Sequence, residues 1–313
     1  MVDLRRPRRG SMAVRPRKRA KTQNVRVYWQ KHQNKRVLGI AGYKAGMMHL
    51  SYIDNSESPT KGQEIVSAAT VIEIPAMLVY GLRFYNTDNS LGDILTADER
   101  ILKKIGTKKK RDDKTPAIEE IKDVKLLVFS QPDKTTIGKK HIERMEIGLG
   151  GKDINEKIEY AKSMLGKELN VNDVFKAGEF VDVISVTKGK GWQGAVKRFV
   201  VKTQRPKSTG KVRHVCTLGQ WHPAYVIYTV PQAGQTGYHT RTERNKMIMK
   251  IGNMEEDINP SAGFPHYGFV RNNYMIVHGS IPGAPKRIVK IRLSARLQVA
   301  EKEPRMIFSS TKK

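Results

Sequence analysis

Apolar residues first gather in the chain after residue 36. Residues 37–54 alternate glycine with apolar residues, and the stretches at 64–75 and 77–85 are rich in valine, isoleucine and aromatic residues. Short runs of this kind, separated by polar turns, are typical of β-strands. We therefore predict antiparallel strands joined by tight turns over residues 37–85, as the first part of a β-barrel or a strongly twisted sheet.

The pattern changes to a helical one after these strands. Thr96 and Glu99 have the spacing of a capping box, and Gly106 follows as a candidate C-terminal cap. Apolar residues at helical spacing predict a second helix at 155–165, after a short strand at 124–129. None of these residues indicates chemistry, so we expect elements that serve packing alone.

Strand signals return in the second half, with one strand predicted at 180–187 and three more between 262 and 294. The long excursion between them predicts a projecting finger, because uncovered loops of this length are uncommon unless functional. The predicted fold is therefore mainly β with a helical insertion (α+β). Its segments are a basic N-terminal extension at 1–36, the first part of the barrel at 37–85, a helical insertion at 86–179, a barrel strand and glycine turn at 180–194, a basic central finger at 195–245, and the last part of the barrel with a C-terminal tail at 246–313.

Charge is distributed unevenly along the 313 residues, whose formal net charge is +28. Residues 54–182 carry 21 Lys and Arg against 23 Asp and Glu, whereas no acid occurs between Asp182 and Glu243. Residues 1–36 carry thirteen basic residues against the single acid Asp3. Charge of one sign repels itself unless a polyanion neutralises it, so both basic segments indicate a nucleic-acid partner. The N-terminal extension lacks apolar residues for a core, and we expect it to be disordered until it binds phosphates.

The composition argues against a membrane protein and a secreted protein. No apolar run approaches the ~20 residues that span a bilayer, and no apolar stretch follows the basic N-terminus as it would in a secretory signal. Gly and Pro interrupt the basic segments, which therefore do not form an amphipathic membrane-surface helix. The single cysteine, Cys216, excludes an intrachain disulfide framework and favours a reducing compartment.

A glycine motif at 189–194 matches G-x-G-x-x-G, the pattern of a dinucleotide-binding turn. That fingerprint requires a following helix and an acidic residue about 20 positions later. Pro206 and Gly210 interrupt any such helix, and no acid occurs before Glu243. We favour a glycine-rich turn against RNA backbone, with a bend of the barrel as the alternative.

Cys216 lies near His214 and His222, an arrangement that invites comparison with a Cys–His nucleophile or a zinc site. A nucleophile also needs an orienting acid or amide, and a structural zinc site usually has more than one thiolate. We therefore predict a buried or RNA-facing thiol, with RNA contacts for these histidines and for His239.

Trp221 is the residue of the finger that most strongly suggests a specific contact. A tryptophan amid basic residues, glycine and proline can stack on an unpaired base, contributing about 1–3 kcal/mol. The alternative is that it packs within the finger against Val215 or Tyr225. Trp192 and Tyr238 are weaker candidates for stacking by the same argument.

Several long stretches of the chain have a specific sequence: RPRRGSMAVRPRKRAK, GIAGYKAGMMHLSYID, NSESPTKGQEIVSAATVIEIPAM, VTKGKGWQGAVKRF, LGQWHPAYV, AGQTGYHTRTERNKMIMKIG and GFPHYGFVRNNYMIVHGSIPGAPKRIVKIR. They resemble the large-subunit ribosomal protein L-three family, in its archaeal branch. The resemblance is weakest over 86–175, and the absence of the long C-terminal extension of eukaryotic members favours the archaeal branch.

The resemblance implies a translation-protein-type β-barrel with a helical insertion, embedded in large-subunit ribosomal RNA. It further implies that the N-terminal extension and the central finger run into the RNA, and that the protein binds early in subunit assembly. The finger tip at Trp221 would then approach the peptidyl transferase centre. Eukaryotic members carry a modifiable histidine upstream of this tryptophan, where this chain has Thr209, so regulation by that modification is not expected here.

We accordingly predict a structural protein of the large ribosomal subunit in the cytoplasm, with no catalytic residues, cofactor, metal, small-molecule substrate or membrane. Its expected partners are 23S-type rRNA and neighbouring large-subunit proteins. A nucleotide-using or RNA-modifying enzyme and a generic nucleic-acid packaging protein are the alternatives. The residues expected to bind rRNA are Arg5, Arg6, Arg8, Arg9, Arg15, Arg17, Lys18, Arg19, Lys21, Lys188, Lys190, Trp192, Lys197, Arg198, Lys202, Arg205, Lys207, Lys211, Arg213, His214, Gln220, Trp221, His222, Tyr238, His239, Arg241 and Arg244.

Overall fold

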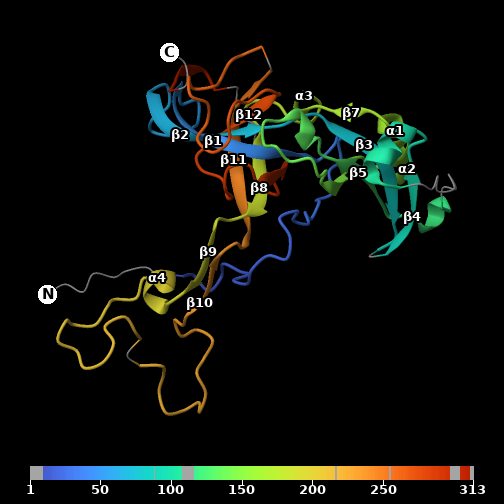
Figure 1. The fold of residues 1–313 in the computed structure, drawn as a ribbon. Coiled ribbons are helices and arrows are strands. Elements are labelled where there is room, and N and C mark those ends of the chain that lie inside the picture. The colour runs from blue at the N-terminus through green and yellow to red at the C-terminus, as the bar shows by residue number, and fades with distance from the viewer. Residues whose placement is uncertain are drawn as a thin grey trace. The chain divides into compact units, whose positions relative to one another are not determined.

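The computed structural model describes residues 10–87, 89–107, 116–215, 217–253, 255–296 and 304–310. The chain divides into two compact units. Unit 1 comprises Met1–Thr22 and Val186–Arg241, and unit 2 comprises Gln23–Ser185 and Thr242–Lys313. Strands outnumber helices among the described residues (Figure 1), which confirms the prediction of a mainly β chain.

The larger sheet has seven strands in the order β13-β8-β11-β12-β2-β1-β14. β13 also pairs with the first residues of β1, at Gly39–Arg292 through Tyr43–Ile288, so the pairings link six strands in a cycle. The strand bounds are β1 (Gly39–Ile53), β2 (Glu64–Glu73), β8 (Phe180–Val186), β11 (Thr240–Gly252), β12 (Tyr274–His278), β13 (Ile288–Leu293) and β14 (Met306–Ser309).

A second sheet runs in the order β4-β3-β5-β6, and β7 pairs with β3. The sequence assigned residues 77–85 to the barrel and predicted a helical insertion at 86–179. Both expectations differ from the structure, because 77–85 form a strand of this second sheet and 86–179 contain its other strands as well as helices. The elements are β3 (Met77–Tyr85), β4 (Ser90–Leu95), α1 (Glu99–Ile105), η1 (Ile118–Glu120), β5 (Asp123–Phe129), η2 (Pro132–Lys134), β6 (Arg144–Gly148), α2 (Ile154–Met164), β7 (Glu168–Leu169) and α3 (Val171–Val174).

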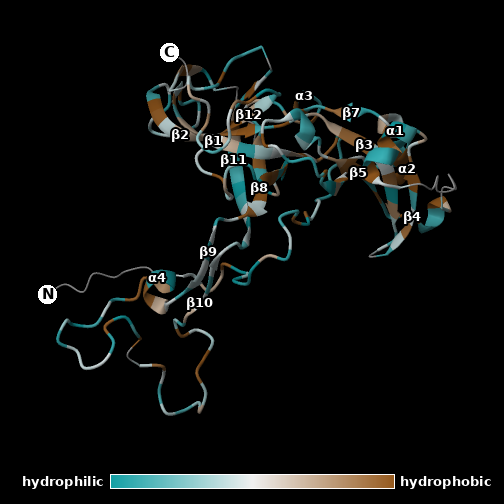
Figure 2. Cartoon of the chain, in the orientation of Figure 1, coloured by the Kyte–Doolittle hydropathy of each residue, from teal (hydrophilic) through white to brown (hydrophobic). Residues whose placement is uncertain are grey.

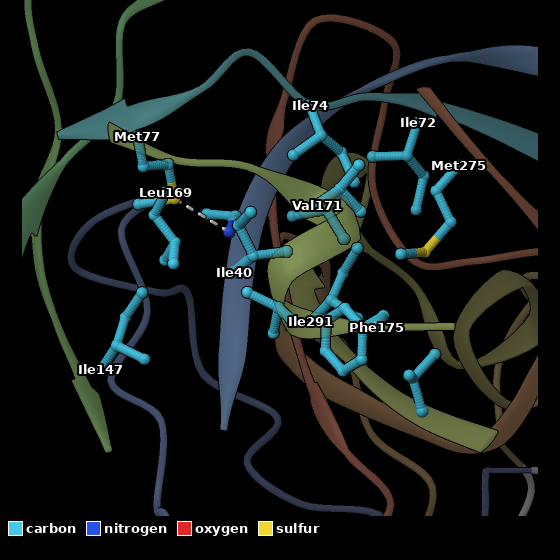
Figure 3. Packing of buried hydrophobic residues seen from close by; sticks show 14 of the residues in the cluster. Ile40, Ile72, Ile74, Met77, Ile147, Leu169, Val171, Phe175, Met275 and Ile291 are labelled. Carbon is cyan, nitrogen blue, oxygen red and sulfur yellow. Dashed lines mark hydrogen bonds between the residues drawn. The ribbon is translucent and has the colours of Figure 1, made fainter. Parts of the chain in front are cut away.

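One apolar cluster joins the two sheets of unit 2. Figure 3 shows Ile40 and Ile291 of the larger sheet close to Met77 and Leu169 of the second sheet. The backbone N–H of Ala41 donates a hydrogen bond to the sulfur of Met77 (3.2 Å). Burial of such side chains stabilises a fold by about 1.5–3 kcal/mol each, and this cluster contains residues of both sheets.

The first turn of α1 is capped by a residue that follows the predicted one. Asp98 is the N-cap, and its carboxylate accepts a hydrogen bond from the N–H of Arg100 (2.8 Å). The hydroxyl of Thr96 instead accepts from the N–H of Asp98 (3.4 Å). The predicted C-terminal cap is confirmed, because Gly106 has a φ of 73°, the left-handed conformation that favours glycine.

Residues 23–36 belong to unit 2, although the sequence placed them in one extension with residues 1–22. Trp29 packs against the core, and a Cβ on Gly148 would lie 2.7 Å from its side chain. Arg36 forms an ion pair with Glu179 (3.0 Å), and the carbonyl of His32 accepts from the N–H of Gly151 (2.9 Å). One large aromatic side chain and several backbone bonds thus attach this basic segment to the fold.

Two fully buried carboxylates hold turns of unit 2 in place. Glu73 accepts hydrogen bonds from the N–H groups of Arg271 (2.9 Å) and Asn272 (3.0 Å), and from the hydroxyl of Tyr267. Burial and the neighbouring Glu73 carboxylate raise the pKa of Tyr267, which keeps it a hydrogen-bond donor. The second carboxylate, Asp182, binds Arg292. Both acids satisfy donors that would otherwise be buried without partners.

Lys290 on β13 is a buried cation whose titration affects stability. Its side chain is 7% exposed, and its ammonium donates to the carbonyl of Val25. Burial lowers the pKa of Lys290 to about 8, while Glu143 and Glu146 oppose that shift. Because the unfolded chain then binds more protons than the folded one between about pH 8 and pH 10.5, the free energy of unfolding rises with pH over this range.

We expect the Lys290 contribution to the free energy of unfolding to increase by about 2–3 kcal/mol between neutral pH and pH 10.5. Urea unfolding of the full chain and of Lys290→Met at several pH values measures this difference directly, since other titrating groups are common to both proteins. Parallel pH profiles for the two proteins would contradict the assignment.

Candidate nucleic-acid interface

Positive charge is concentrated in unit 1. Within its bounds the sequence has nineteen Lys and Arg and a single acid, Asp3. The described parts of the unit, residues 10–22 and 186–241 without 216, contain no carboxylate side chain at all. Charge of one sign destabilises a compact unit by self-repulsion unless counter-charge is supplied from outside. The unit is therefore suited to a polyanion.

The scaffold of unit 1 is a two-stranded ribbon of β9 (Gly189–Gln193) and β10 (Gly234–Gly237), followed after β9 by α4 (Ala195–Phe199). A Cβ on Gly237 would lie 2.0 Å from the carbonyl of Lys188, so the backbones approach closely there. Residues 189–193 of the glycine motif thus form a strand rather than the predicted turn, and Gly194 is the N-cap of α4. The helix after it has five residues, which is too short for the helix that a dinucleotide-binding turn requires.

The N-terminal segment, residues 10–22, contacts residues 238–241, which follow this ribbon. The N–H of Ala20 donates to the carbonyl of Tyr238 (2.8 Å), and Arg241 donates to the carbonyl of Pro16 (2.8 Å). A ring nitrogen of His239 lies 3.0 Å from the carbonyl of Lys18. The disorder predicted for residues 1–36 without RNA stays a prediction, and in the structure backbone and side-chain groups of residues 238–241 contact Pro16, Lys18 and Ala20.

Three arginines of this segment alternate along the chain and each lies over an aromatic ring. Alternate residues of an extended chain project to the same side, so the spacing places all three guanidinium groups against aromatic rings of residues 199–238. Guanidinium–ring contacts of this kind contribute about 0.5–1 kcal/mol each at exposed sites. The pairs, with distances from the guanidinium carbon to the ring centroid, are Arg15 with Tyr228 (5.3 Å), Arg17 with Phe199 (5.1 Å) and Arg19 with Tyr238 (5.5 Å).

A cluster of like charges is formed by Arg17, Arg198 and Arg241. Burial, followed by the charge of Arg17, lowers the pKa of Arg198 and of Arg241. Backbone carbonyls hold these side chains: Arg198 donates from Nε to Gln235 (3.2 Å). Three cations gathered without an acid have the charge that an anion would neutralise.

Trp221 is 87% exposed, and Tyr225 is 72% exposed. Trp221 therefore does not pack against Val215 or Tyr225, which was the alternative prediction. Its nearest ring partner is His222, at 6.4 Å between centroids in an edge-on arrangement. Trp192 on β9 is 75% exposed as well. Figure 2 shows apolar and polar residues intermixed along the long loops of this unit. Exposed aromatic faces among cations can stack on unpaired bases.

The remaining predicted residues divide into three groups. Arg5, Arg6, Arg8, Arg9 and the thiol of Cys216 lie outside the described residues. Arg244 belongs to unit 2, where it lines a cavity of about 380 Å³ together with Arg26 and Arg292. The residues that are exposed on unit 1 are Lys18, Lys21, Lys188, Lys190, Lys197, Lys202, Arg205, Lys207, Lys211, Arg213, His214, Gln220 and His222.

Sequence reasoning missed the aromatic residues that anchor the N-terminal segment, namely Phe199 and Tyr228. The alternation of Arg15, Arg17 and Arg19 was the available signal, since it indicates an extended segment with one contacting side. His214 contacts the carbonyl of Lys211 rather than a second ligand-type side chain. Among the described residues no group of three or more His, Cys, Asp or Glu is arranged to hold a metal ion.

Comparison with known proteins assigns the family. The sequence model described as Ribosomal protein L3 matches residues 1–310. The chain belongs to the ribosomal protein L3 family. The chain is 44% identical over 328 residues to the large ribosomal subunit protein uL3 of Methanocaldococcus jannaschii, with 99% of this chain and 98% of that protein covered. It is 41% identical over 331 residues to the uL3 protein of Methanothermobacter thermautotrophicus, with the same coverage of both chains.

The L3 assignment confirms the predicted archaeal resemblance. Members of this family are structural ribosomal proteins and not enzymes, which confirms the prediction of a non-enzymatic role. In the described part of the chain no helix is both long and apolar enough to cross a membrane.

Proposed function

We propose that this L3-family chain is a structural constituent of the large ribosomal subunit in the cytoplasm, where it binds 23S-type rRNA and neighbouring large-subunit proteins. The proposal rests on the composition of unit 1, which has nineteen basic residues, one acid and several exposed aromatic rings. Lys and Arg bind phosphates and release counterions, whereas aromatic rings stack on unpaired bases. This combination matches single-stranded and junction regions of folded RNA better than a regular duplex.

The cycle of six paired strands in the larger sheet supports a closed β-barrel of the translation-protein type. On this proposal, residues 195–245 are the central finger and residues 1–22 a second RNA-binding segment. The finger supports RNA near the peptidyl transferase centre, and the protein joins the subunit early in assembly. The bounds of the finger at 195 and 245 remain predictions.

Sedimentation of a tagged copy in cell lysate tests the proposal. We expect the protein to remain with large subunits through a high-salt wash, because a segment threaded into RNA cannot leave without opening the RNA structure. Release by the wash, or sedimentation with precursors alone, would contradict a structural role. Equal affinity of the purified chain for random duplex at high salt would favour a generic packaging protein instead.

Trp221→Ala tests the role of the finger tip. The side chain is 87% exposed, so we expect the free energy of unfolding to change by less than about 0.5 kcal/mol. Subunits should still incorporate the variant, but their sensitivity to peptidyl transferase inhibitors and their translation fidelity should change. Phe308→Ala, at an exposed ring of unit 2 outside the predicted rRNA-binding residues, is the control. Wild-type behaviour of Trp221→Ala in both assays would remove the role assigned to the tip.

A further inference from the structure

A cavity of about 550 Å³ lies within unit 1, between the N-terminal segment and the loop that precedes β10. Its volume is within the range of small-molecule and cofactor sites, about 300–1,000 Å³, and is sufficient for a nucleotide. Its lining residues come from both segments and from α4. They include Arg15, Arg17, Arg198, Phe199 and Tyr228.

The cavity combines a flat apolar wall with three cations. Tyr228 is 74% exposed, so its ring is accessible, and Arg15 lies over that ring. Guanidinium planes and aromatic rings are the two kinds of side chain on which unpaired RNA bases stack. Arg17 and Arg198 each lie 5.1 Å from the ring centroid of Phe199. The cavity therefore has an aromatic surface on which a base could stack, and positively charged side chains lie beside that surface.

The two arginines are held before any ligand arrives. Arg17 donates to the carbonyl of Gly10 (2.7 Å), and Arg198 donates to the carbonyl of Gln232 (3.1 Å). Phe199, the ring to which both are close, is only 5% exposed, and a Cβ on Gly10 would lie 2.3 Å from it. A fixed guanidinium loses less conformational freedom on binding a phosphate than a mobile one does. The arrangement therefore favours a defined phosphate position.

We propose that this cavity receives one unpaired nucleotide of ribosomal RNA, with its base stacked against Tyr228 and Arg15 and its phosphate bound by Arg17 and Arg198. The inference rests on the proposed function and specifies one contact of it. The absence of carboxylates from the described part of unit 1 supports an anionic occupant. The accessible ring beside the cations favours a nucleotide over an acidic peptide, because a carboxylate side chain gains little from a flat aromatic wall.

Chemical probing of rRNA in large subunits that carry single variants of the full chain tests this contact. Tyr228→Ala removes the stacking wall and Arg17→Gln the phosphate ligand. The controls are Tyr225→Ala, which removes a ring of similar exposure from the same loop, and Arg100→Gln, which removes an exposed arginine of unit 2; neither residue lines the cavity. We expect both test variants to raise the 2′-hydroxyl acylation of the same unpaired nucleotide by about fivefold or more, while the controls leave that nucleotide protected.

The experiment distinguishes a failure of this inference from a failure of the proposed function. If wild-type protein protects rRNA but Tyr228→Ala and Arg17→Gln alter no nucleotide that the controls leave unchanged, the cavity does not hold a nucleotide and the proposed function stands. A photo-crosslinker at position 228 that captures a ribosomal protein in place of rRNA would also overturn the inference. If wild-type protein protects no rRNA nucleotide, the proposed function itself fails.

Discussion

Replacing Asp182 with alanine is expected to lower the free energy of unfolding by about 3–5 kcal/mol, because it leaves a buried arginine without its counter-ion. Asp182 is fully buried and Arg292 is 11% exposed; the two atoms of their ion pair are 2.9 Å apart. The same carboxylate accepts from the N–H groups of Asn245 (3.2 Å) and Ala295 (3.1 Å). The substitution therefore removes the partners of several donors at once.

Urea unfolding of the full chain, followed by circular dichroism, measures this loss. Glu57→Ala provides the matched control, since Glu57 is an exposed acid of unit 2, and surface substitutions usually change stability by no more than about 0.5 kcal/mol. A loss of less than about 1 kcal/mol for Asp182→Ala would mean that water or local rearrangement replaces the ion pair.

Deleting residues 1–22 is expected to weaken binding of the purified chain to large-subunit rRNA by about a hundred- to a thousandfold at physiological salt, because the deletion removes nine of the nineteen basic residues of unit 1. The slope of log affinity against log salt should become less steep by about 0.7–0.9 for each phosphate that the shortened chain no longer neutralises. Filter binding at several salt concentrations gives both quantities. An unchanged slope would show that these residues do not bind phosphates.

Replacing Arg15, Arg17 and Arg19 together by lysine separates the contribution of charge to RNA affinity from the contribution of the guanidinium–ring contacts. It preserves the net charge but removes the planar groups that lie over Tyr228, Phe199 and Tyr238. We expect an affinity between those of the wild type and the deletion, with a salt slope close to that of the wild type. Binding as tight as the wild type would show that the guanidinium–ring contacts do not organise the RNA-binding surface.

The strands of the larger sheet could be predicted because their composition is distinctive, whereas the assignment of 77–85 could not. Residues 64–73 are rich in β-branched residues and residues 77–85 in aromatic ones, both typical of strands, yet β2 pairs with β1 and β3 pairs with β5. Pairing partners depend on registers between residues far apart in the sequence, and local composition does not encode them. The two short strands β4 and β7 lack a strong alternating pattern, so the sequence predicted a helical insertion in their region.

The charged part of the candidate interface could be predicted for a similar reason. A stretch without acids is visible in the sequence, and most of its predicted lysines and arginines are exposed. The contacts of Arg15 and Arg17 with aromatic rings could not be predicted, because their partners lie about two hundred residues later in the chain. The cavity is lined by residues 12–17 and by residues 198–233, so neither stretch of sequence alone predicts its position.

The pairing of β1 with β13 has a consequence for the order of synthesis. The ribosome makes β1 first, and β13 begins only at Ile288, more than two hundred residues after Ile53. At about 5–20 residues per second, one edge of β1 waits on the order of ten to fifty seconds for its partner. An unpaired strand edge is a template for pairing with other chains, so this interval is when newly made copies are most prone to aggregate. Slower translation of the middle of the chain lengthens that interval.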